Sequence, residues 1–234
     1  RCCRREQIVE TAIRIADDEG FEAVSMRRIA AELGAGTMTL YHYVRTKGEL
    51  VALMRDRIMG ELIVPDDELA DDWREGLAQL ARRTRDVLVR HPWIVRHIGE
   101  EEGDPAGPNF LRHVEQSLAV ASRMGLPIER QFEVTAFVDD YVFGHVLRQQ
   151  DARRARNPEG VVQRKLGGMA QYLDSQLRTG EYPHLEAFAG DDPAGAFQRL
   201  AELAGDVDRR FERGLQLILD GIAREIKQQA ADSR

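Results

Sequence analysis

The sequence predicts an all-α protein, with a small N-terminal helix-turn-helix domain of three helices and a larger helical domain after it. Helix-forming residues dominate the 234-residue chain, and aromatic residues make up only 6% of it. No segment alternates apolar and polar residues cleanly enough to indicate a β-sheet. Apolar residues instead recur at intervals of three and four in successive segments, as expected for helices with one buried face.

The first fifty residues contain three short helical segments. The first is expected over residues 4–19, and Phe21 and Val24 after it are expected to fill the core of a three-helix domain. Ser25 is suited to cap the second helix, because its hydroxyl can accept a backbone N–H at a helix start. Gly34 can adopt the left-handed conformation that ends this helix. The apolar face between them consists of Ile29, Ala30 and Leu33.

A turn at Gly36 leads to a third helix, which Thr37 is suited to cap. We expect Met38, Leu40 and Val44 to point toward the core. Two helices joined by a short glycine turn are typical of a helix-turn-helix, whose second helix enters the major groove of DNA. The same spacing also occurs in helical proteins where such residues only cover a neighbouring helix. The outward residues carry hydroxyl, imidazole and phenol groups suited to base edges and phosphates, and they are Thr37, Thr39, Tyr41, His42 and Tyr43.

Proline, glycine and acidic stretches divide the remaining chain into helices. A connecting helix is expected over 47–64, where Pro65-Asp66-Asp67 interrupts it. We place the domain boundary within this helix, between a domain at 1–50 and a second domain at 65–234. Loops are expected at 100–108 and 151–160. The other expected helices are 71–90, 93–99, 109–124, 128–150, 161–178 and 206–227. Asn109 is suited to cap the helix that begins with it.

The helices at 128–150 and 206–227 are apolar on more than one face. Such helices must be buried on several sides. Two chains would contribute four of them and form a bundle, so the pattern favours a homodimer. Packing of both helices within one monomer is the alternative. A helix-turn-helix protein usually reads paired half-sites, which also requires twofold symmetry.

The composition argues against several other classes of protein. Cys2 and Cys3 are adjacent, which suits a disulfide poorly, and no metal-ligand partner follows them. The six histidines form no i, i+4 pair, and neither a nucleophile elbow nor a phosphate loop is present. We therefore expect no catalytic residues, no metal and no cofactor. The chain has no long apolar segment and no signal-peptide pattern, which predicts a cytoplasmic protein without a membrane span.

The net charge of −7 counts mildly against binding to nucleic acid. Acidic and basic residues balance within residues 1–50, however, so the excess of acid lies in the rest of the chain. A local basic face can still bind phosphates, with a strong dependence on salt. Arg1, Arg4 and Arg5 oppose the dipole of the first helix, which leaves either a phosphate contact or a solvated helix end as their explanation.

Several segments of the first fifty residues share one register with a known family. They are Thr11-Ala12, Gly20-Phe21, Val24-Ser25-Met26-Arg27-Arg28-Ile29-Ala30, Leu33-Gly34, Thr39-Leu40-Tyr41-His42-Tyr43-Val44 and Lys47-Gly48-Glu49-Leu50. Together they resemble the N-terminal domain of the TetR family of transcriptional regulators. A less specific resemblance, to the C-terminal domain of the tetracycline-repressor branch, rests on Arg90-His91-Pro92-Trp93, Gly144-His145-Val146-Leu147 and the segment from Phe211 to Gly221.

The resemblance implies a homodimeric, ligand-responsive repressor that binds double-stranded DNA at a palindromic operator. It implies that Arg27 and Thr37 reach base edges, and that His42 packs in the groove and touches a base. The positions that hold phosphates are then Ser25, Thr39, Tyr41, Tyr43 and Lys47. A helical ligand-binding module without DNA binding, or an enzyme, is the alternative reading.

The resemblance further implies a small-molecule effector site within the second domain. Arg148 follows the segment after which the tetracycline-repressor branch carries a carboxylate associated with magnesium. Because arginine cannot serve a cation site, magnesium–tetracycline is not the expected ligand. For each polar candidate, an ordinary core or surface role is at least as good an explanation. The candidate lining is Leu80, Thr84, Leu88, His97, Phe110, His113, Gln116, Phe137 and Tyr141.

Overall fold

The computed structural model describes residues 4–97, 107–156 and 205–232, together with 172, 175–177, 179–190, 192, 195 and 199. Every regular element in this part of the chain is a helix, which confirms the predicted fold class. The chain divides into two compact units. One comprises residues 1–147 and 219–234, and the other comprises residues 148–218.

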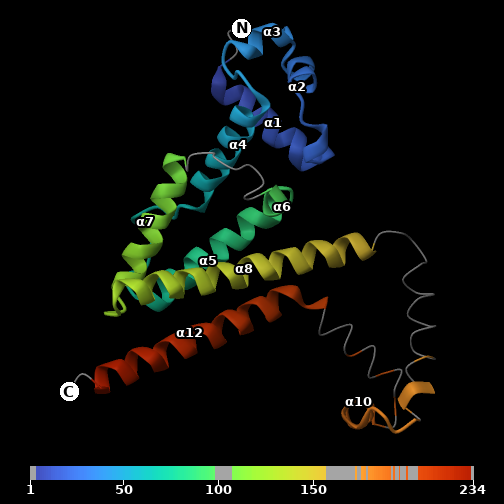
Figure 1. Ribbon diagram of the computed structural model, residues 1–234, viewed down its shortest axis with the longest axis vertical. Coiled ribbons are helices and arrows are strands. Elements are labelled where there is room, and N and C mark those ends of the chain that lie inside the picture. Colours follow the sequence, from blue (N-terminus) through green and yellow to red (C-terminus); the bar gives the residue numbers. More distant parts are fainter. Residues whose placement is uncertain are drawn as a thin grey trace. The chain divides into compact units, whose positions relative to one another are not determined.

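Four short helical elements form the N-terminal end of the first unit (Figure 1): α1 (Arg5–Glu19), η1 (Phe21–Ala23), α2 (Met26–Leu33) and α3 (Thr37–Tyr41). Ser25 caps α2 as predicted, because its Oγ accepts the backbone N–H of Arg28 at 3.2 Å. Gly34 ends α2 in the left-handed conformation at φ 63°. The side chains that fill the core between these helices include Ile8, Ala12, Ile15, Val24, Ile29, Leu40 and Val44.

Helix α4 (Lys47–Leu62) connects this N-terminal domain to the helices that follow it, and it packs against α1, α5 and α7. Thr46 caps it by accepting the N–H of Glu49 at 3.0 Å. The helix ends two residues before the predicted Val64. This end is consistent with Pro65, which disfavours a helical conformation at the residue before it.

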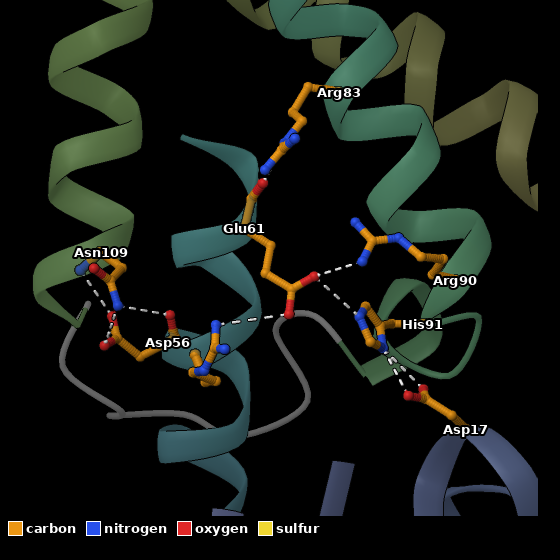
Figure 2. Close-up of polar contacts among 8 residues, drawn as sticks. Asp17, Asp56, Glu61, Arg83, Arg90, His91 and Asn109 are labelled. Carbon is orange, nitrogen blue, oxygen red and sulfur yellow. Dashed lines mark hydrogen bonds and ion pairs between the residues drawn. The ribbon is translucent and has the colours of Figure 1, made fainter. Parts of the chain in front are cut away.

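Helices α5 (Trp73–Arg90), α6 (Ile94–His97) and α7 (Pro108–Ser122) follow in the same unit. Gly76 of α5 allows a close approach to α7, since a Cβ at this position would lie 2.8 Å from a methyl group of Val120. Asp56 of α4 accepts the backbone N–H of Asn109 at 2.9 Å and its side-chain N–H at 3.0 Å (Figure 2). Asn109 was expected to cap α7, but Gly107 holds the cap position, so Asn109 instead ties α7 to α4.

Two long helices carry the C-terminal half of the chain, α8 (Ile128–Arg156) and α12 (Val207–Asp232). Between them in sequence lies α10 (Pro183–Ala189), whose Ala189 is buried with Leu177 in the second unit. Within the first unit, Arg130 near the start of α8 bonds Glu225 near the end of α12 at 2.6 Å. This ion pair joins the start of α8 to the C-terminal part of α12.

The two long helices both continue past their predicted ends. Residues 151–156 were expected to begin a loop, but they continue α8, and α12 extends to Asp232 rather than Lys227. Alanine, arginine and glutamine are good helix formers, so these sequences offer no stop signal. The predicted helix at 161–178 falls mostly outside the described residues. Among the described helices, none combines the length and apolar character that crossing a membrane requires.

Candidate DNA-binding surface and effector region

Helix α3 presents a polar surface on a firmly anchored turn. Leu40 and Val44 are fully buried and hold the segment to the N-terminal core. The backbone N–H groups of Tyr43 and Val44 both donate to the carbonyl of Leu40, at 2.9 and 3.0 Å, which extends the turn beyond the end of α3. Of the predicted outward residues, Thr39, Tyr41 and His42 are exposed, whereas Thr37 and Tyr43 are partly buried.

The side chain of Met38 on α3 does not have the predicted orientation. It was expected to point inward, but its side chain is 74% exposed. Met38 lies two residues from Leu40, which places it about 200° away around the helix axis and hence on the opposite side. Thr37 is also the first residue of α3 rather than its cap, a position that Gly36 occupies. The exposed surface of α3 therefore combines polar groups with one apolar side chain.

The two arginines at the start of α2 have different surroundings. The guanidinium of Arg28 bonds Glu19 at 2.6 Å and Glu32 at 2.7 Å, which ties α2 to the end of α1. Arg28, together with Arg14, which bonds Glu32 at 2.8 Å, lowers the pKa of Glu32. Arg27 is exposed, and it forms no ion pair with any carboxylate in the part of the chain that the structure describes. Arg27 is therefore available to an external anion.

Lys47 begins α4 and is exposed. Its ammonium lies 5.7 Å from the centroid of the Phe21 ring, within the range of a cation–π contact. Nearby, Glu49 accepts the backbone N–H of Arg45 at 2.7 Å and pairs with Arg5 at 2.6 Å. The hydrogen bond from Arg45, with Arg5, lowers the pKa of Glu49. These contacts fix the start of α4 against the start of α1, next to the surface that α3 presents.

The candidate effector residues on α5 and α7 are mostly buried. Leu80, Thr84 and Leu88 follow one another at four-residue spacing along α5, which packs against α7. His113 of α7 is buried, and its Nδ1 has no hydrogen-bond partner among the described residues. Burial lowers the pKa of His113, so that its ring is neutral near pH 7. Thr84 and His113 thus place polar groups within an otherwise apolar region.

Other candidate effector residues lie in different surroundings. Gln116 is buried, but both ends of its amide bond the backbone of Val64. Phe110 and Phe137 are exposed, and Tyr141 is partly buried with its ring 6.2 Å from that of His145. The side chain of His97 lies outside the described residues. The structure therefore groups only part of the predicted lining between α5 and α7.

Comparison with known protein families decides the classification. The family model described as bacterial regulatory proteins, tetR family, matches residues 8–54. The model of the tetracyclin repressor-like C-terminal domain matches residues 64–226, which is more than half of the chain. The chain belongs to the TetR family. This membership confirms the resemblance seen in the sequence, and the tetR-family match spans α2, α3 and parts of α1 and α4.

Individual TetR proteins resemble the chain over most of its length. The transcriptional repressor DrrR1 of Streptomyces coeruleorubidus is 34% identical over 97% of this chain and 80% of the relative. ActR of Streptomyces coelicolor, solved in complex with actinorhodin, is 30% identical with a TM-score of 0.66, covering 94% of this chain and 95% of ActR. BioQ, solved with its double-stranded DNA operator, is 25% identical with a TM-score of 0.54, covering 66% of this chain and 90% of BioQ.

The contacts between the N-terminal helices of this TetR protein and the helices that follow were not predicted from the sequence. Asp17 of α1, His91 at the end of α5 and Trp93 before α6 form one hydrogen-bonded group. His91 and Trp93 each lie more than seventy positions from Asp17 in sequence. The only signal for them was the segment from Arg90 to Trp93, which the resemblance identified without assigning it a role.

Proposed function

We propose that this protein is a homodimeric transcriptional repressor that binds a palindromic operator through α3 and is released from it by a small hydrophobic molecule. The observation that carries the proposal is the exposed surface of α3, where hydroxyl, imidazole and phenol groups project from a turn anchored by Leu40 and Val44. The repressor name of DrrR1 and the operator complex of BioQ support the same function. Because its target is DNA, we place the protein in the cytoplasm and assign it no catalytic role.

In this proposal, side chains at the DNA surface divide between reading and positioning. Arg27, exposed and without an ion-pair partner among the described residues, is suited to grip a guanine through two hydrogen bonds. Thr37 and His42 contact bases beside it. Phosphate contacts fix the register without reading sequence, and they are assigned to Ser25, Thr39, Tyr41, Tyr43 and Lys47.

The partner subunit is proposed to cover α8 and α12. Four large apolar side chains of α8 are more than a third exposed, namely Ile128, Phe132, Phe137 and Leu147. An apolar stripe of this kind marks an interaction surface, since soluble monomers rarely leave such patches in water. Gly144 of α8 and Gly221 of α12 are exposed, with open space where a Cβ would stand, which permits close approach of another helix. Phe137 then serves the dimer more directly than the effector.

The effector is proposed to bind between α5, α7 and α8. Leu80 and Leu88 supply apolar surface, and Thr84 and His113 supply the few polar groups that orient a ligand. The complexes of ActR with (S)-DNPA and actinorhodin support a small-molecule site in this protein. The effector shifts the dimer toward a shape that no longer fits two half-sites, and the shift is limited by its differential affinity for the two shapes.

Selection of DNA from a random-sequence pool tests this function. The purified full chain is incubated with the pool at low salt, bound duplexes are recovered and sequenced, and the oligomeric state is measured by sedimentation. We expect a dimer and an inverted repeat whose half-sites are about one helical turn apart. A lone subunit that retains no duplex would refute the proposal.

A further inference from the structure

A group of four side chains joins the N-terminal DNA-binding helices to the effector domain. We call the group formed by Asp17, Glu61, His91 and Trp93 the interdomain joint (Figure 2 shows three of them). Asp17 lies near the end of α1, Glu61 near the end of α4, and His91 and Trp93 flank the turn between α5 and α6. The joint therefore connects helices that belong to both domains.

Asp17 receives hydrogen bonds from two rings of the effector domain. The indole Nε1 of Trp93 donates to its carboxylate at 2.8 Å, and the Nδ1 of His91 lies 2.9 Å from both carboxylate oxygens. Trp93 also stacks on Phe21 of η1, with ring centroids 5.3 Å apart and an interplanar angle of 16°. The end of α1 and the element after it are thus fixed to the α5–α6 turn by both polar and apolar contacts.

His91 also reaches α4 through its second nitrogen. Its Nε2 lies 3.4 Å from Glu61, so that each ring nitrogen faces a carboxylate (Figure 2). A neutral imidazole carries one N–H and can donate to only one of these carboxylates, whereas the protonated ring donates to both. Burial lowers the pKa of His91, but Asp17 and Glu61 outweigh it, and the net shift raises the pKa above its usual value.

Other charged groups around the joint moderate this bridge. Glu61 also pairs with Arg90 of α5 at 2.9 Å and with Arg57 of α4 at 3.6 Å. Beside Asp17, Arg14 and Asp18 of α1 line a small cavity with Arg57 and Glu61. The arginines partly neutralise the carboxylate of Glu61, so the contact of His91 with Asp17 is the stronger half of the bridge, consistent with its shorter distance.

We propose that His91 is a positioning residue for DNA binding, which acts by bridging Asp17 and Glu61 and so holds the DNA-binding helices in one orientation on the effector domain. This inference rests on the proposed function of α3. A domain held in its binding orientation loses less conformational freedom when it engages DNA, and its affinity is higher for that reason. As the pH rises through the pKa of His91, the ring loses one N–H, the bridge weakens, and DNA affinity falls.

The test compares the pH dependence of DNA affinity in the full chain and in His91→Gln, with a duplex that wild-type protein selects from a random pool. Between about pH 6 and pH 8, where histidines titrate, we expect the affinity of wild type to fall about five- to tenfold more than that of His91→Gln, the lower range of coupling between sites. His42→Gln is the matched control, because His42 is an exposed histidine on the DNA-binding surface itself. The extra fall should persist in His42→Gln.

A second measurement judges the joint without DNA. The pKa of His91 is measured by NMR titration in the wild-type chain and in Asp17→Asn, which keeps the shape of the side chain and removes its charge. We expect a lower His91 pKa in the variant. An identical pH dependence of DNA affinity in wild type and His91→Gln overturns the proposal, and so does an unchanged His91 pKa in Asp17→Asn. A wild-type chain that binds no duplex refutes the proposed function instead, and the titration still decides whether the bridge exists.

Discussion

Replacing Gln116 by leucine separates a structural role of this side chain from a role in effector binding. Its Nε2 donates to the carbonyl of Val64 at 2.7 Å, and its Oε1 accepts the N–H of Val64 at 3.0 Å. Val64 lies two residues after the end of α4, so the helix does not pair its backbone N–H and carbonyl. Both residues are only 8% exposed, so water replaces these hydrogen bonds poorly.

The expected cost follows from the two backbone groups that leucine leaves unpaired. An unsatisfied buried donor or acceptor costs about 1–3 kcal/mol, so the substitution should destabilise the protein by about 2–6 kcal/mol. A groove of about 720 Å³ lies along Gln116, between α7 and residues 63–71, and water entering from it favours the lower part of this range. Even that part is a large fraction of a typical stability of about 5–15 kcal/mol.

Urea unfolding followed by circular dichroism measures the effect. We expect Gln116→Leu to lower the denaturation midpoint without changing the slope of the transition. Glu115→Gln is the matched control, since Glu115 is exposed on the neighbouring position of α7 and its change should stay within about 0.5 kcal/mol. A Gln116→Leu protein that unfolds at the wild-type urea concentration would refute the structural role and return Gln116 to the list of effector ligands.

Three further substitutions test other parts of the account. Arg27→Ala should reduce the preference for the selected duplex over a scrambled one by about 1–3 kcal/mol, because a bidentate base contact is lost. Tyr41→Phe should instead weaken binding to both duplexes alike. Competition binding with the two duplexes distinguishes these effects. Burial, together with the neighbouring Asp140, raises the pKa of Asp139 from 3.8 to about 6 in the folded protein. Asp139 therefore ionises at lower pH in the unfolded chain, and the folded state loses stability as the pH rises from about 4 to about 6. Asp139→Asn should therefore raise the thermal unfolding temperature near pH 8 and have little effect near pH 4, and an equal shift at both pH values would contradict this explanation.

Local signals in the sequence were sufficient for the frame of the N-terminal domain. Ser25 marks the start of α2 and Gly34 marks its end, as predicted, because a capping hydroxyl and a left-handed glycine act on adjacent backbone groups. The orientation of Met38 was predicted wrongly, since a helix of five residues shows too little periodicity to define its faces. The outward orientation of Met38 follows from its spacing of two residues from the buried Leu40.

Contacts between distant segments left no comparable signal. Asn109 was a reasonable cap by type, yet its side chain bonds Asp56, more than fifty residues earlier. The sequence alone is equally consistent with Gln116 as a ligand contact or as a core group, and its two hydrogen bonds to the backbone of Val64 favour the second role. The family resemblance supplied the expected domain order and the proposed DNA-binding positions, but the pairing of His91 with Asp17 required the folded structure.

The central claim is that the exposed surface of α3 lies against DNA, and Met38→Glu tests it most directly. Met38 is 74% exposed, so a glutamate there should leave thermal unfolding unchanged. A negative charge at this position would face the phosphates, and like charges brought together cost several kcal/mol, which corresponds to a loss of affinity of about 100-fold or more. We expect this loss for the selected duplex in a stably folded variant. Wild-type affinity in Met38→Glu would contradict it.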